Sequence, residues 1–143
     1  RHAELIHPRH ERFEIPAAAA PDSVLLEATE QPDFRGNTSL TGYAGVATAT
    51  GIPTVLGWYG HERLWRSGQE RVLQELETRR ADVEQIYRTP DLQQAEELLQ
   101  KYAVDYIYVG GLERDLYGRE SLAKFAALAQ PVFENNEVVI YGR

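Results

Sequence analysis

The run from Val104 to Val109 constrains the fold most, because it has the composition of a strand and lies between two helical patterns. Its β-branched and aromatic residues favour a strand, and Gly110-Gly111 ends the run. The apolar stripe before it consists of Leu92, Ala95, Leu98, Leu99 and Tyr102, and the stripe after it of Leu122, Phe125, Ala126 and Ala129. Strands separated by helices favour an α/β layer with at least one right-handed crossover.

Two more strands are predicted in the N-terminal half. Residues 23–28 contain the short apolar run of a buried strand, and residues 53–58 have a second one. Between them, residues 30–51 predict a long loop, because glycine and proline recur along it. A loop of this length in a compact domain often has a function.

The C-terminal half predicts helices followed by a hairpin. A helical pattern runs from about Leu64 to Tyr87. Thr89-Pro90-Asp91 then predicts a new helix, with Thr89 as the hydroxyl cap. After Pro131, residues 132–141 predict a β-hairpin. We therefore expect an α/β fold with a small mixed sheet, in the order strand, loop, strand, two helices, strand, helix and hairpin.

The chain of 143 residues fits one domain. Residues 1–22 contain three prolines and an alanine run, together with apolar residues that can pack, so we expect a partly docked N-terminal linker there and a single domain over residues 23–143. The chain begins at Arg1 and contains no Met, which leads us to expect a piece of a larger protein.

Charge and motif content exclude several kinds of function. The net charge of −7 argues against a nucleic-acid partner. The chain has no Cys, so it makes no disulfide and no thiolate. The common nucleotide-binding motifs are missing, and His61-Glu62 does not extend to a zinc-protease motif because residue 65 is Trp. We therefore expect no metal and no cofactor.

The segment 43–66 is the densest in residues that bind ligands. Its glycines allow close approach of the backbone, its aromatic rings stack on sugars, and its charged side chains can orient hydroxyls or pair with phosphate. Glu27 ends the first predicted strand, where ligands of open α/β sheets bind. The candidate substrate-binding residues are Glu27, Tyr43, Thr54, Trp58, His61, Glu62, Trp65 and Arg66. No catalytic residue is assigned. The alternative is that the tryptophans are core and that His61-Glu62 caps a helix.

Several motifs in order resemble the Chlor-Arch-YYY family of polytopic membrane proteins. They include Leu26-Glu27-Ala28, Gly51-Ile-Pro-Thr-Val-Leu-Gly-Trp58, Gly60-His61-Glu62 and Tyr106-Ile-Tyr-Val-Gly110, and the resemblance spans about residues 23–143. It implies the C-terminal extracytoplasmic domain of a multi-span membrane protein, whose membrane part is similar to class C glycosyltransferases that use polyprenyl-phosphate sugars.

The resemblance implies a domain that is not an active enzyme alone. The main catalytic carboxylates would lie in the membrane part of the parent chain, and this domain would help to form the donor or acceptor glycan site. Its partners would be that membrane part and a glycan or polyprenyl-phosphate sugar. Two alternatives stay open: a structural or protein-interaction module, and a free-standing hydrolase that uses Glu27 and Glu62 as acid and base.

Overall fold

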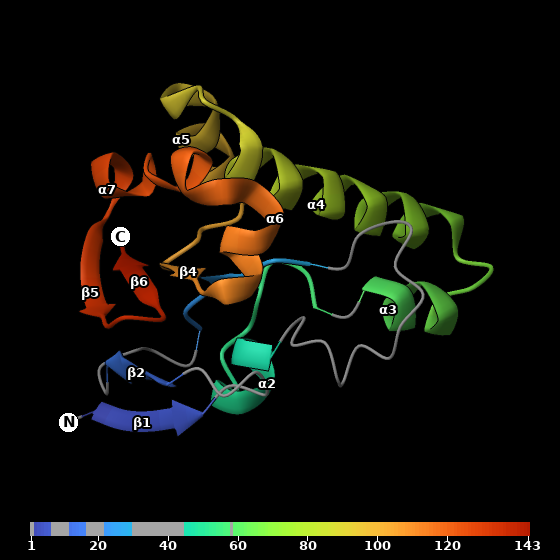
Figure 1. The fold of residues 1–143 in the computed structure, drawn as a ribbon. Helices are drawn as coiled ribbons and strands as arrows, with labels where there is room; N and C mark the ends of the chain where they lie inside the picture. Colours follow the sequence, from blue (N-terminus) through green and yellow to red (C-terminus); the bar gives the residue numbers. More distant parts are fainter. Residues whose placement is uncertain (1, 7–11, 17–21, 30–44, 58) are drawn as a thin grey trace.

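The computed structural model describes residues 2–6, 12–16, 22–29, 45–57 and 59–143. The chain has an α/β fold built on a four-stranded mixed sheet (Figure 1). The strand order is β3 (Leu25–Leu26), β4 (Tyr106–Val109), β6 (Val139–Gly142) and β5 (Gln130–Glu134). β3 and β4 are parallel, whereas β6 is antiparallel to both of its neighbours. The predicted fold class is confirmed, as are the strand of residues 104–109 and the terminal hairpin.

Helices cover both faces of this sheet (Figure 1). One face is covered by α4 (Glu70–Arg88), α5 (Leu92–Lys101), α6 (Gly111–Leu122) and α7 (Phe125–Leu128). The short helix α2 (Gly45–Thr50) covers the other face, and α3 (Tyr59–Trp65) precedes α4. Because strand side chains alternate between faces, Ile107 and Val109 pack in the larger cluster and Tyr108 in the smaller one.

The centre of the larger cluster is the side chain of Tyr87, which is fully buried. Its ring stacks on Tyr117 with centroids 4.6 Å apart and meets the edge of Phe125 at 5.6 Å. Its hydroxyl donates to the carbonyl oxygen of Tyr108 at 2.9 Å. One residue of α4 therefore connects α6, α7 and the central strand.

Three local predictions are wrong. Residues 53–57 make only one parallel bridge, between Thr54 and Leu25, because β3 is two residues long. The predicted helix of residues 64–87 is instead two helices, separated at Gly68, which has a φ of +87°. The cap of α5 is Asp91, whose carboxylate accepts from the amides of Gln93 and Gln94.

The expected loop and the expected partly docked linker both contain regular secondary structure. Residues 45–50 form α2, and residues 30–44 of the predicted loop lie outside the described residues. The N-terminal region contains an antiparallel pair, β1 (His2–Ile6) and β2 (Arg12–Pro16). β1 contacts α2 and β2 contacts β5, so this region is attached to the sheet domain.

Candidate functional site

A cleft of about 420 Å³ lies between the segment after the Thr54 bridge and helices α3 and α4. We call it the α3–α4 cleft. It is lined by Thr54, Val55, Leu56, Gly57, Glu62, Arg66, Val72, Glu75, Leu76 and Arg79. Its volume falls in the range of small-molecule sites. Two carboxylates and two guanidinium groups face one hollow, which supplies both acceptors and donors to a ligand with hydroxyl groups.

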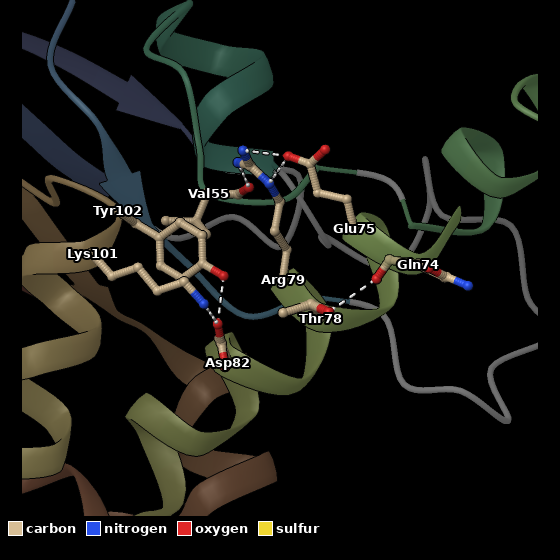
Figure 2. Close-up of polar contacts among 8 residues, drawn as sticks. All are labelled: Val55, Gln74, Glu75, Thr78, Arg79, Asp82, Lys101 and Tyr102. Carbon is tan, nitrogen blue, oxygen red and sulfur yellow. Dashed lines mark hydrogen bonds and ion pairs between the residues drawn. The ribbon is translucent and has the colours of Figure 1, made fainter. Parts of the chain in front are cut away.

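Arg79 fixes one wall of this cleft (Figure 2). Its Nη1 donates to the carbonyl oxygen of Val55 at 3.2 Å, and its Nη2 lies 3.1 Å from a carboxylate oxygen of Glu75. Its guanidinium also lies over the ring of Tyr102, 5.5 Å from the centroid. These contacts hold the 54–57 segment against α4, so the polar wall is formed before any ligand arrives.

The opposite wall is a looser ion pair. Glu62 and Arg66 lie one turn apart, with 3.3 Å between the carboxylate oxygen and Nε. Their side chains are 34% and 48% exposed. Exposed pairs of this kind stabilise a fold by only about 0.3–0.5 kcal/mol. Either side chain can therefore leave this ion pair and bind a ligand with little loss of folding stability.

Thr54 adds a polar group without a partner. Its Oγ1 is buried and makes no hydrogen bond with any described residue. Such groups are rare in folded proteins and call for an explanation. Thr54 is also one of the residues that line the α3–α4 cleft.

A second hollow of about 340 Å³ is also lined by Arg79. It shares Glu75 and Arg79 with the α3–α4 cleft and adds Lys101 and Tyr102. Asp82 accepts hydrogen bonds from Lys101 and from the hydroxyl of Tyr102. The two hollows form one polar surface along α4. The sequence did not single out Glu75 or Arg79, because an i,i+4 pair on a helix has the pattern of a solvated face.

Glu27 does not line the α3–α4 cleft, and its assignment to a ligand-facing edge is not supported. It is 2% exposed, and its two oxygens accept from the amides of Val46 at 3.0 Å and Ala47 at 3.1 Å. Its carboxyl group therefore holds the first turn of α2 against the sheet. Burial raises its pKa to about 8 even though the Ala47 amide lowers it, and the nearby Glu113 raises it further.

This shift predicts a pH dependence of stability. The pKa of Glu27 is about 8 in the fold and close to 4.5 in an unfolded chain, so the folded state binds more protons between these values. The contribution of Glu27 is fully present below pH 4.5 and is lost as the pH rises toward 8. The full contribution is on the order of 5 kcal/mol.

Denaturant unfolding at a series of pH values measures this effect. Glu27→Gln removes the titrating group, so its unfolding free energy should change less between pH 5 and 8 than that of the wild type. Equal slopes for the two proteins would show that Glu27 stays ionised throughout.

The structure describes some of the other candidate residues and not others. Thr54, Glu62 and Arg66 come together in the cleft. Trp65 is 67% exposed, so the interpretation of Trp65 as core is wrong. Tyr43 and Trp58 lie outside the described residues, and of His61 only the backbone, within α3, is described. A hydrolase pair of Glu27 and Glu62 is not formed, since the first is sealed in the core.

The described residues show neither a metal-binding cluster nor a membrane-spanning helix. Within the described part of the chain, no group of three or more His, Asp or Glu side chains has the arrangement of a metal site. No helix there has the length and apolar composition needed to cross a bilayer. Comparisons with protein-family models, curated proteins and solved structures find no match.

Proposed function

We propose that this chain is a non-catalytic, extracytoplasmic domain that binds the sugar of a glycan or polyprenyl-phosphate sugar in the α3–α4 cleft. Its parent would be a membrane-embedded protein of the glycosyltransferase type, and the transmembrane part of that parent its partner. The observation that carries the proposal is the polar lining of the cleft, with Glu62 and Arg66 facing Glu75 and Arg79. Carboxylates and guanidinium groups are the side chains that hydrogen-bond sugar hydroxyls most strongly.

An exposed aromatic ring on the same helix as Glu62 supports the same ligand class. Trp65 lies three residues after Glu62 on α3, so the two side chains lie on neighbouring parts of one helix face. The Trp65 side chain is largely exposed. A sugar held by the charged groups would present its apolar face to this indole.

Replacing Glu62 with glutamine tests the proposal. The variant keeps the size of the side chain and removes its charge, so a charge-assisted bond to a hydroxyl is weakened. We expect a loss of affinity of about tenfold, on the scale of one such bond. Stability should change by less than about 0.5 kcal/mol, because the ion pair with Arg66 is exposed. Calorimetric titration with oligosaccharides and short-chain polyprenyl-phosphate hexoses measures the affinity.

Glu97→Gln is the matched control. Glu97 is exposed on α5, does not line the cleft, and accepts a hydrogen bond from Gln93 in the same helix. The Glu97→Gln variant should bind the sugar with the affinity of the wild type. Equal losses in both variants, or no binding by the wild type to any member of the panel, would contradict the proposed sugar site.

A protein-interaction module is the second candidate, and one observation favours it. Leu64 and Trp65 are adjacent on α3 and are 73% and 67% exposed. Large apolar side chains exposed together mark interaction surfaces more often than isolated ones do. If Trp65→Ser disrupts association with the membrane part of the parent while sugar affinity is unchanged, this second function is the correct one.

A further inference from the structure

A separate cleft at the carboxyl end of β4 concentrates positive charge on this acidic chain. It has a volume of about 300 Å³ and lies between α6 and the β5–β6 turn. Its polar lining consists of Arg114, Arg119, Asn135, Asn136 and Tyr141, and no acidic side chain is among the described residues that line it. We call it the arginine cleft. The chain as a whole has a net charge of −7, so the excess of positive charge in this cleft is a local feature.

The two arginines reach one cleft because α6 is bent. Residues five positions apart on a regular helix point about 140° away from each other. Gly118, between them, has φ 77° and ψ 155°, a conformation that is open almost only to glycine. The bend changes the direction of the last residues of α6, so that both guanidinium groups line the same hollow. Backbone strain of this kind often accompanies a functional site.

Neither guanidinium is neutralised by a described carboxylate. Arg114 donates to the backbone carbonyl of Glu137, which positions the group and leaves its charge uncompensated. Arg119 makes no ion pair with any described residue. Elsewhere in the described part of the chain, five arginines pair with carboxylates: Arg66, Arg79, Arg80, Arg88 and Arg143. Arg63 and Arg71 also make no ion pair with a described residue, so what distinguishes the arginine cleft is that two such arginines line one hollow.

We propose that the arginine cleft binds the phosphate group of a phosphorylated ligand. Guanidinium groups bind phosphate oxygens with paired hydrogen bonds, and asparagine and tyrosine side chains supply further donors. The location of the arginine cleft agrees with this proposal, because ligands of α/β sheets bind beyond the carboxyl ends of parallel strands. β3 and β4 are the parallel pair, and Val109 at the end of β4 lines the cleft. This inference goes beyond the proposed sugar site and does not depend on it.

Titration of the 143-residue chain with inorganic pyrophosphate, followed by amide NMR shifts, tests the proposal. We expect saturable shifts in residues 114–123 and 135–139. Arg119→Gln and Arg114→Gln should each weaken binding at least fivefold. Arg119 is exposed and unpaired with described carboxylates, so its variant should fold like the wild type. Arg71→Gln, an exposed arginine on α4 that does not line the arginine cleft, is the charge-matched control and should bind like the wild type.

Two arms of the experiment distinguish the sources of the phosphate. Competition of pyrophosphate by phosphatidic acid vesicles, but not by phosphatidylcholine vesicles, identifies a lipid headgroup. Competition by hexose phosphates alone identifies a free phosphorylated metabolite. The proposal is overturned if pyrophosphate gives no saturable shifts, if the shifts lie outside the arginine cleft, or if Arg71→Gln weakens binding as much as Arg119→Gln.

Discussion

Glu113→Ala is expected to lower the free energy of unfolding by about 3–5 kcal/mol, since it removes two buried hydrogen bonds to a carboxylate. Glu113 is 2% exposed. Its oxygens accept from the amide of Ala28 at 2.9 Å and from that of Gly110 at 2.9 Å. The side chain thereby joins the ends of the parallel strands β3 and β4 to the first turn of α6. Alanine leaves both amides buried without an acceptor.

Chemical denaturation of three variants measures this effect. Glu113→Gln keeps one acceptor oxygen and should fall between the wild type and Glu113→Ala. Glu120→Ala makes the same substitution at an exposed position of α6 and should change stability by less than about 0.5 kcal/mol. A Glu113→Ala protein within about 1 kcal/mol of the wild type would show that the two amides find other acceptors.

Tyr87→Ala is the second large effect, with an expected loss of about 4–5 kcal/mol. Removal of a buried aromatic ring costs about 3–5 kcal/mol through lost contacts and the cavity that remains. The stacked contact with Tyr117 and the edge contact with Phe125 are lost together. The carbonyl oxygen of Tyr108 also loses its donor.

Tyr87→Phe separates the ring from the hydroxyl. It keeps both aromatic contacts and removes the hydroxyl, which donates to the carbonyl oxygen of Tyr108 at 2.9 Å and lies 3.4 Å from that of Leu26, so it should cost about 1 kcal/mol. Thermal and urea unfolding of the two variants give the difference. Equal losses for Phe and Ala would mean that the hydroxyl, and not the packing of the ring, connects the helices to the sheet.

The parts of the fold that depend on local pattern were predictable from the sequence. The strand up to Val109, the apolar face of α5 and the C-terminal hairpin follow from alternation, helical spacing and turn residues over short distances. The 53–57 segment has the same strand composition but makes only one bridge. Its partner β3 is too short to pair with more of it, which is a property of the tertiary structure.

The candidate site was predictable only in part, for a similar reason. Polar residues that accompany glycine in one segment indicate Thr54, Glu62 and Arg66, and these three residues share a cleft. The position of Glu27 at the end of a predicted strand indicates a ligand-binding carboxylate. The sequence does not reveal that a helix within the expected loop places its amides on this carboxylate. The role of Arg79 also depends on a distant contact, with the carbonyl oxygen of Val55.

Amide chemical-shift mapping of the wild-type chain with a short-chain polyprenyl-phosphate hexose tests the central claim most directly. If the α3–α4 cleft is the sugar site, saturable shifts should concentrate in residues 54–57 and around Glu62, Glu75 and Arg79. Shifts confined to other surfaces, or no shifts at millimolar ligand, would contradict a sugar-binding role for this domain.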